Sequence, residues 1–201
     1  MGVSLDERAL AGLGAYLKLL ERWGSRINLV GTTRREDLLE RHLLDSLAPV
    51  PLVRAEGPHI RLIDVGSGAG LPGVPIALAC PQASVTLLEP RQKRVNFLRA
   101  VARECFTWNV EIAARRLEDL LASDPGGFDI AVSRATFPPL ELPRRVGPMV
   151  RPGGLLIGFT TRTTPGSSEA SGDLGAPRVM AYPDPGDTNG LRLTYWRRSH
   201  S

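Results

Sequence analysis

The sequence predicts a doubly wound α/β fold with a helical extension at its N-terminus. From about residue 60 onward, short apolar segments that suit buried strands alternate with helical segments, a pattern typical of a mostly parallel sheet covered by helices. The first 55 residues instead carry apolar side chains at helical spacing only. We therefore expect a helical extension over residues 1–55 and one compact α/β domain over residues 56–201.

The extension begins with an amphipathic helix. Ser4 and Glu7 form a capping box, in which the serine caps the helix and the glutamate reaches back. Gly24 is expected to end this helix. Its apolar face consists of Leu10, Leu13, Leu17, Leu20 and Trp23.

A second helix is expected to follow. Thr33 and Glu36 form another capping box, and two prolines, Pro49 and Pro51, close the helix. Its apolar face consists of Leu39, Leu43 and Leu47.

The α/β domain is expected to contain five strands and then a hairpin. The strands fall at residues 60–65, 85–89, 110–113, 128–132 and 155–159, with helices at 74–79 and 93–103 and a turn at 151–154. Residues 160–177 are rich in Thr, Ser, Gly and Pro without periodicity, which predicts a flexible loop. Segments 178–182 and 191–196 are expected to add a hairpin at the sheet edge.

Composition places the chain among globular proteins. It has 201 residues, of which 42% are hydrophobic and 23% charged, and its first residues lack the pattern of a signal peptide, so we expect a cytoplasmic protein without a membrane span. Two cysteines, Cys80 and Cys105, are expected to be buried reduced thiols and not metal ligands. The net charge of +4 is compatible with a polyanionic partner, but a GC-rich genome explains the excess of arginine as well.

A glycine-rich turn follows the first strand of this domain. Residues 64–70 read DVGSGAG, a G-x-G-x-G spacing that differs from the G-x-G-x-x-G of dinucleotide dehydrogenases. Glycines at alternate positions allow a sharp turn whose backbone approaches a ligand closely. S-adenosylmethionine carries a sulfonium and an ammonium group but no phosphate, so a carboxylate such as Asp64 beside the turn suits it. A purely structural turn is the alternative.

Glu89 stands at the end of the second strand, where carboxylates commonly accept hydrogen bonds from the ribose hydroxyls of a nucleotide. Its alternative interpretation is an exposed residue at a strand end. Beside the glycine turn we favour the cofactor-binding interpretation.

The residues after the fourth strand exclude some substrates. Residues 132–139 read VSRATFPP, without the Asn/Asp-Pro-Pro-aromatic tetrapeptide that is usual for amino-group methylation of adenine or cytosine. Neither cysteine has the setting of a cytosine carbon-5 nucleophile. An acceptor that already has a nucleophilic lone pair, such as guanine N7, needs no general base, and we therefore expect none.

Three polar residues outside the turn are candidates for contacts. Arg134, alone after a buried strand, suggests a contact with a phosphate or a carboxylate. His42 and Asp45 are spaced i and i+3 on one helix and can touch each other. The alternative is a structural hydrogen bond that ties this helix to the sheet.

With these motifs in view, the chain resembles the RsmG/GidB family of bacterial methyltransferases, which act on guanine N7 of small-subunit (16S) ribosomal RNA. The matching segments are residues 28–30 (NLV), 40–47 (ERHLLDSL), 62–75 (LIDVGSGAGLPGVP), 93–98 (KRVNFL), 116–118 (RLE), 133–135 (SRA) and 151–154 (RPGG). The resemblance implies a Rossmann-like class I methyltransferase sheet, S-adenosylmethionine as cofactor, and ribosomal RNA as the partner of a monomer.

The resemblance also implies roles for single residues. Gly66 and Leu71 contact the cofactor with Gly68 beside them, Leu117 and Glu118 lie against its adenine, and Arg134 borders the mouth of the cofactor or substrate site.

The chain departs from the family at the end of the fifth strand. A Lys-Gly pair is usual there, whereas this chain has Thr160, Thr161 and Arg162, of which Arg162 is a candidate to contact RNA phosphates instead. Two alternatives therefore stay open: a paralogue that binds cofactor or RNA without methylating, and a small-molecule methyltransferase. A dehydrogenase is disfavoured by the glycine spacing.

Overall fold

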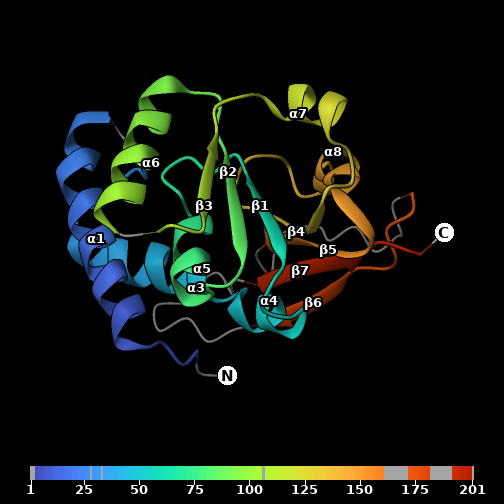
Figure 1. Ribbon diagram of the computed structural model, residues 1–201, viewed down its shortest axis with the longest axis horizontal. Helices are drawn as coiled ribbons and strands as arrows, with labels where there is room; N and C mark the ends of the chain where they lie inside the picture. The colour runs from blue at the N-terminus through green and yellow to red at the C-terminus, as the bar shows by residue number, and fades with distance from the viewer. Residues whose placement is uncertain are drawn as a thin grey trace.

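Seven strands form one sheet in the part of the chain that the structure describes (Figure 1). The structure is a computed structural model, and it describes residues 3–27, 29–32, 34–105, 107–160, 172–181 and 192–200. The strands are β1 (Arg61–Val65), β2 (Ser84–Leu88), β3 (Val110–Ala113), β4 (Phe128–Ser133), β5 (Val150–Thr160), β6 (Arg178–Ala181) and β7 (Arg192–Arg197).

The sheet order is β3-β2-β1-β4-β5-β7-β6. Strands β1 to β5 are parallel, and β7 is antiparallel to both of its neighbours. The predicted doubly wound α/β fold is confirmed, and so is the late hairpin at its edge.

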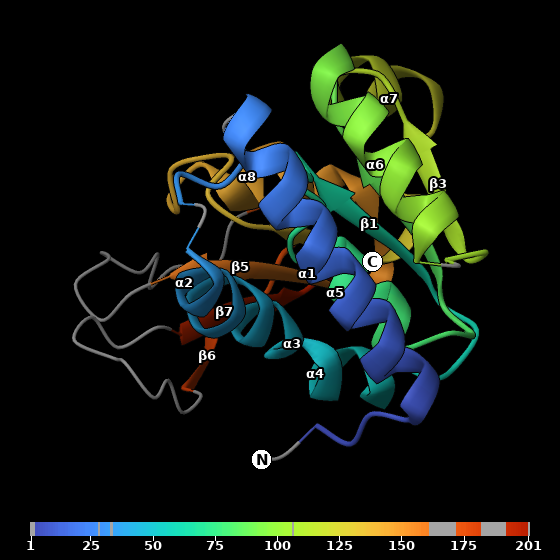
Figure 2. The same ribbon diagram turned by 90° about the vertical axis from the view of Figure 1, so that its left-hand side faces the viewer.

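Helices cover both faces of the sheet (Figures 1 and 2). On one face lie α1 (Glu7–Ile27), α5 (Gly73–Ala79) and α6 (Gln92–Glu104), and on the other lie α7 (Leu117–Ser123) and α8 (Leu142–Val146), followed by the 3-10 turn η2 (Gly147–Met149). The extension continues after α1 through α2 (Arg35–Asp37), the π-helix η1 (Leu38–Leu44), α3 (Asp45–Leu47) and α4 (Val50–Ala55). Helices α7 and α8, of 7 and 5 residues, are missing from the sequence-based prediction because such short helices show no clear periodicity.

The first helix differs from its prediction at both ends. The backbone N–H of Ala9 donates to Asp6 Oδ1 at 2.7 Å, so the capping side chain is that of Asp6 and not of Ser4. Gly24 does not end the helix, which runs on to Ile27. A helical glycine costs only about 1 kcal/mol, and the neighbouring Trp23 packs edge-to-face on Phe97 of α6 at a ring distance of 5.7 Å.

The predicted apolar face of α1 is wrong at Leu10, which is 55% exposed. The buried face consists of Ala9, Leu13, Tyr16, Leu17, Leu19 and Leu20. It packs against α5 and α6.

The second predicted helix is not a single α-helix. A π-helix closes hydrogen bonds from i to i+5, so residues five apart share a face, and the buried pair is Leu38 and Leu43. Leu39, expected on the apolar face, is 40% exposed. The predicted cap Thr33 lies outside the described residues. Pro49 and Pro51 do not close the segment, since they sit at the start of α4, where proline is tolerated.

Two predictions around β5 also change. The turn expected at residues 151–154 is part of β5, which pairs with β4 from Val150 onward across a register shift. Of the loop expected at residues 160–177, residues 161–171 lie outside the described residues. Beyond them Leu174 is 2% exposed and bridges to Arg198, which fixes that end of the segment.

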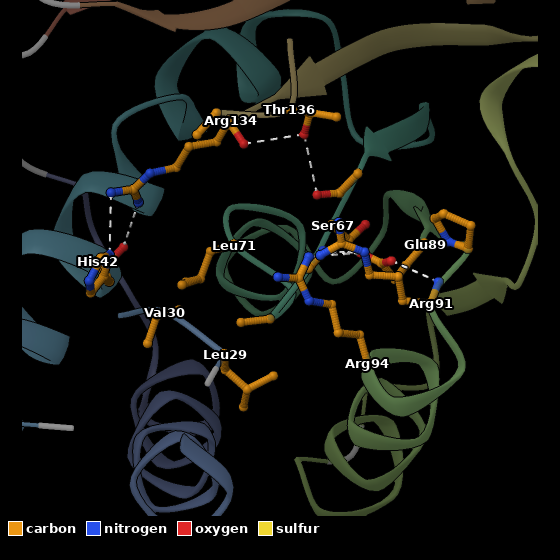
Figure 3. A pocket seen from close by; sticks show the side chains of 15 residues that line it. Leu29, Val30, His42, Ser67, Leu71, Glu89, Arg91, Arg94, Arg134 and Thr136 are labelled. Carbon is orange, nitrogen blue, oxygen red and sulfur yellow. Dashed lines mark hydrogen bonds and ion pairs between the residues drawn. The ribbon is translucent and has the colours of Figure 1, made fainter. Parts of the chain in front are cut away.

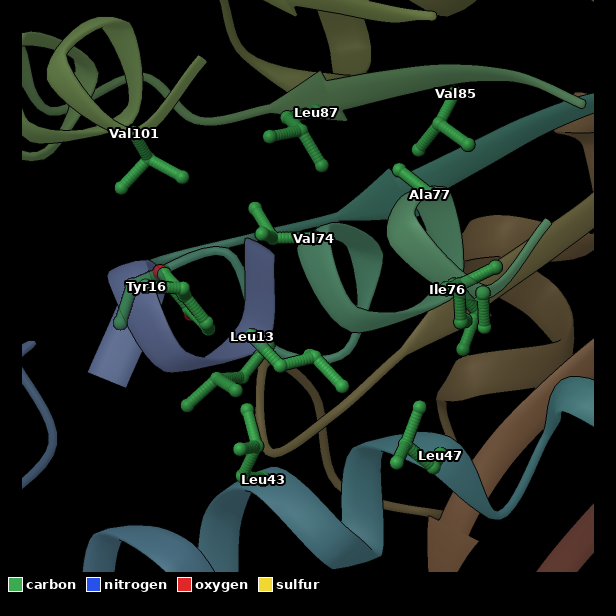
Figure 4. Close-up of a cluster of buried hydrophobic side chains, with 14 of the residues drawn as sticks. Leu13, Tyr16, Leu43, Leu47, Val74, Ile76, Ala77, Val85, Leu87 and Val101 are labelled. Carbon is green, nitrogen blue, oxygen red and sulfur yellow. The ribbon is translucent and has the colours of Figure 1, made fainter. Parts of the chain in front are cut away.

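The extension and the sheet share one hydrophobic core (Figure 4). Leu13 and Leu43 of the extension lie in the same buried cluster as Val74 of α5 and Leu87 of β2. The predicted boundary at residues 55/56 lies in the connection between α4 and β1. The segments before and after this boundary contribute side chains to the same core. No helix among the described residues is long and apolar enough to cross a membrane. Both cysteines are free thiols, and Cys105 is buried as predicted. The predicted burial of Cys80 is wrong, since this residue at the end of α5 is partly exposed.

One hydrogen bond joins the extension to the glycine-rich turn. The hydroxyl of Tyr16, on α1, donates to the carbonyl of Ala69 at 2.6 Å, and the tyrosine is fully buried. Burial raises the pKa of Tyr16, so the hydroxyl keeps its proton and remains a donor.

Replacement of this donor tests its contribution. Tyr16→Phe leaves the buried Ala69 carbonyl without its partner, so we expect the free energy of unfolding to fall by about 1–3 kcal/mol in urea denaturation. Leu10→Ala, at an exposed position of the same helix, is the control and is expected to change it by about 0.5 kcal/mol or less. Equal stability of Tyr16→Phe and the wild type would contradict the assigned role.

Candidate functional site

A cavity of about 570 Å³ lies at the carboxyl ends of the central parallel strands (Figure 3). Three of its walls come from the turn after β1 (residues 66–71), the segment after β2 (residues 89–94) and the segment after β4 (residues 134–136). The fourth comes from the extension, through Leu29, Val30 and His42. Strand order reverses between β1 and β4, and ligands of doubly wound sheets bind at such a switch point.

The glycine-rich turn after β1 forms one wall of the cavity. Gly66, Gly68 and Gly70 all have positive φ, between 58° and 88°, a conformation that favours glycine. A Cβ on Gly66 would collide with the side chain of Thr136, which donates a hydrogen bond to the Val65 carbonyl at 3.1 Å. The space beside Gly66 is thus filled by Thr136, while Gly66 and Gly68 present backbone without side chains to the cavity.

Glu89 lies in the wall beside this turn and is 2% exposed. Its Oε2 accepts the Gly68 N–H at 3.0 Å, and its Oε1 accepts the Arg91 N–H at 2.8 Å. The Arg94 guanidinium is 3.6 Å from Oε2. A carboxylate has about four lone-pair sites, so these contacts orient Glu89 and leave it able to accept further hydrogen bonds.

Asp64 does not line the cavity. It is fully buried, and its Oδ2 accepts the N–H of Gly73 at 2.9 Å, where α5 begins. A Cβ on Gly73 would stand 2.7 Å from this oxygen, which explains the glycine. The expectation that this carboxylate faces a cationic ligand is thus wrong, because it is used inside the fold to join β1 to α5.

The Asp64 carboxyl is also unusual in its protonation. Its Oδ1 has no hydrogen-bond partner among the described residues. Burial raises the pKa of Asp64 from 3.8 to about 7, against the lowering effect of the Gly73 N–H.

Arg134 binds the extension to the end of β4. Its guanidinium donates to the carbonyls of Arg41 (2.8 Å) and His42 (3.2 Å), to Ser46 Oγ (3.2 Å) and to Asp45 Oδ2 (3.2 Å). These contacts occupy the N–H groups of both terminal nitrogens, while one edge of the side chain borders the cavity. The contact expected with a carboxylate is present, within the protein. His42 and Asp45 meet through Arg134, which ties their helical segment to the sheet.

His42 is a cavity residue that the sequence-based site does not include. Its Nδ1 lies 3.5 Å from an Arg134 terminal nitrogen. Burial first, and the Arg134 charge second, lower the pKa of His42 from 6.5 to about 4, so the imidazole is neutral near pH 7. Other lining residues missing from the prediction are Leu29, Val30, Arg91, Arg94 and Thr136. The signal for His42 was its place in the ERHLLDSL helix, but the sequence gives no way to tell a lining residue from a structural one.

The structure brings together five of the seven predicted site residues. Gly66, Gly68, Leu71, Glu89 and Arg134 all line the cavity. Leu117 and Glu118 do not: Leu117 belongs to the core between α7 and the sheet, and the Glu118 side chain is 66% exposed, 3.9 Å from Arg145. Their contact with an adenine stays a prediction. Thr160 is buried and bonds to Thr194 at 2.9 Å, whereas Thr161 and Arg162 lie outside the described residues.

Comparison with known families gives one match across most of the chain. Residues 9–163 match the model of the GidB family, described as rRNA small subunit methyltransferase G. A ribosomal RNA small subunit methyltransferase G from Sorangium cellulosum is 41% identical over 89% of this chain and 76% of its own length. The protein of the same name from Alkalilimnicola ehrlichii is 45% identical over 67% of this chain, but the match spans only 59% of that relative's length.

Solved structures share the fold. A methyltransferase from Geobacter sulfurreducens superposes with a TM-score of 0.63 at 14% identity, covering 97% of both chains. A SAM-dependent O-methyltransferase from Thermotoga maritima gives a TM-score of 0.57 at 14% identity, covering 78% of this chain and 65% of the other. At 14% identity the structural similarity shows a common fold only.

The raised pKa of Asp64 predicts a pH-dependent stability. Because the folded-state pKa of about 7 exceeds the reference value of 3.8, the carboxyl is most favourable below about pH 4, and stability falls as pH rises to about 7. We expect Asp64→Asn, which does not titrate, to lack this fall. Urea denaturation between pH 4 and 8 measures it as the difference in slope between variant and wild type. Parallel curves would contradict the assignment.

Proposed function

The chain belongs to the GidB family of rRNA small subunit methyltransferase G proteins, and on that premise we propose that it methylates guanine N7 in 16S ribosomal RNA with S-adenosylmethionine as cofactor. The observation that carries the proposal is the cavity in which the G-x-G-x-G turn faces the buried carboxylate of Glu89. Bacterial ribosomes assemble in the cytoplasm, where we propose that the chain acts as a monomer.

The residues of the cavity fit this cofactor. Glu89 supplies acceptors for a ribose diol from a buried, prearranged carboxylate, and the bare turn at Gly66 and Gly68 allows close approach of a ligand. Leu71 adds an apolar contact. A volume of about 570 Å³ falls within the range of about 300–1,000 Å³ that is usual for ligands of this size.

The bound cofactor would supply an electrophilic methyl group, and the protein's task is to align the acceptor with it. Guanine N7 has a free lone pair and loses no proton when it is methylated, so no general base is needed. In keeping with this, the two lining residues that could act as a base, Glu89 and His42, are held by other groups. Glu89 is bonded to backbone N–H groups, and His42 is neutral beside Arg134.

Cofactor affinity tests the role of Glu89. Glu89→Gln removes the charge and one acceptor from the wall, so we expect S-adenosylhomocysteine to bind about 10–100-fold more weakly in calorimetry. Glu104→Gln, which removes an exposed carboxylate paired with Arg22, is the matched control and is expected to bind like the wild type. Unchanged affinity in Glu89→Gln, or tight binding of NAD by the wild type, would refute the cofactor assignment.

The reaction itself is tested on RNA. We expect nucleoside mass spectrometry to find a gain of 7-methylguanosine when small-subunit ribosomal RNA, or the assembling subunit, is treated with protein and cofactor. Cofactor binding without methyl transfer to either substrate would support the non-methylating paralogue instead. RNA affinity that is weak and insensitive to salt would favour a small-molecule methyltransferase.

A further inference from the structure

We propose that His42 selects guanine by donating a hydrogen bond from Nε2 to the base's O6, with Arg134 as the positioning residue that aims the imidazole. This inference rests on the proposed function and names the part of the cavity that takes the acceptor base. The extension would thus contribute directly to substrate recognition.

The position of His42 supports this role. Figure 3 shows His42 and Arg134 on the opposite side of the cavity from Glu89 and Arg94, with the turn between them. With the ribose assigned to Glu89, the His42 side is left for the acceptor. The apolar side chains of Leu29 and Val30 line the same side and offer contact to a flat base.

The tautomer of His42 follows from its neighbour. The Arg134 terminal nitrogen that lies 3.5 Å from Nδ1 carries only N–H groups and a positive charge, and both of its hydrogens are used by Arg41 and Asp45. A proton on Nδ1 would point at this cation, so the geometry favours the lone pair of the imidazole on Nδ1. In a neutral imidazole the proton then sits on Nε2. No hydrogen bond of Nε2 exists within the described residues, so this N–H is free to bind a ligand.

The donor matches guanine and opposes adenine. Guanine presents two acceptors side by side, O6 and N7, whereas adenine has an amino group in place of O6. A donor that takes O6 leaves the N7 lone pair free, and against adenine it would face another donor. Discrimination between guanine and adenine by such a hydrogen bond is strong, because with adenine the Nε2 donor would stay unpaired in the site.

The charge of His42 is consistent with the product. Methylation at N7 leaves a positive charge on the purine, which a neutral imidazole does not repel. Three charged groups act on the His42 ring. Arg134 and Arg41 disfavour its protonation, whereas Asp37 favours it. The effect of Asp37 is smaller than that of burial and smaller than that of Arg134, so the pKa of His42 is lowered.

Variants at position 42 test the donor. We expect His42→Leu to lower kcat/KM for ribosomal RNA by about 10–100-fold, while its affinity for S-adenosylhomocysteine stays that of the wild type. His42→Gln, whose amide N–H reaches about as far as Nε2, is expected to recover most of this loss. His59→Gln, at an exposed histidine, is the control.

Histidine NMR gives a readout that does not depend on turnover. In the cofactor-free protein we expect a His42 signal with the proton on Nε2 and a pKa near 4, which rises toward 6.5 in Arg134→Gln. A proton on Nδ1, full kcat/KM in His42→Leu, or failure of His42→Gln to recover activity would each overturn the proposal. Failure of the wild type to form 7-methylguanosine would instead refute the proposed function.

Discussion

The architecture of the site depends on one guanidinium. Arg134 follows the end of β4 and donates hydrogen bonds to two backbone carbonyls of η1 and to a hydroxyl and a carboxylate of α3. In a π-helix the backbone carbonyls do not accept hydrogen bonds in the α-helical i to i+4 pattern. A guanidinium is planar and has five N–H donors in a fixed arrangement, so it can donate to several of these carbonyls at once. Among the described residues, these contacts of Arg134 attach the wall that carries His42 to the end of β4.

Much of the fold could be predicted from the sequence. The sheet was predictable because its strands are short apolar runs bounded by turn residues, and because strands alternating with helices favour a parallel arrangement. The segment Leu38–Leu44 could not be predicted. A leucine-rich segment read with an α-helical period places Leu39 inside, and only tertiary packing selects the wider π-helix that buries Leu38 and Leu43. The family and the cofactor-binding fold inferred from the motifs are confirmed.

The site residues that could be predicted are those whose residue type is required by the backbone conformation or by the position at a strand end. Gly66 and Gly68 were identified because alternate glycines require positive φ, and Glu89 because strand ends of a parallel sheet meet at one edge. Asp64 was misplaced because a carboxylate next to a turn can point either to the ligand or to a helix N-terminus, and the sequence does not say which. His42 was missed as a lining residue because the direction of its ring depends on Arg134, 92 positions away in the chain.

The shared core has a consequence for how the protein is made. Helix α1 is synthesised before its partners, because its buried face packs on α5, which ends at Ala79, and on α6, which ends at Glu104. At about 5–20 residues per second, roughly 4–15 s pass between completion of α1 and completion of α6. During that interval the part of the α1 face that packs on α6 lacks its partner, and a chaperone or the ribosome surface can cover it.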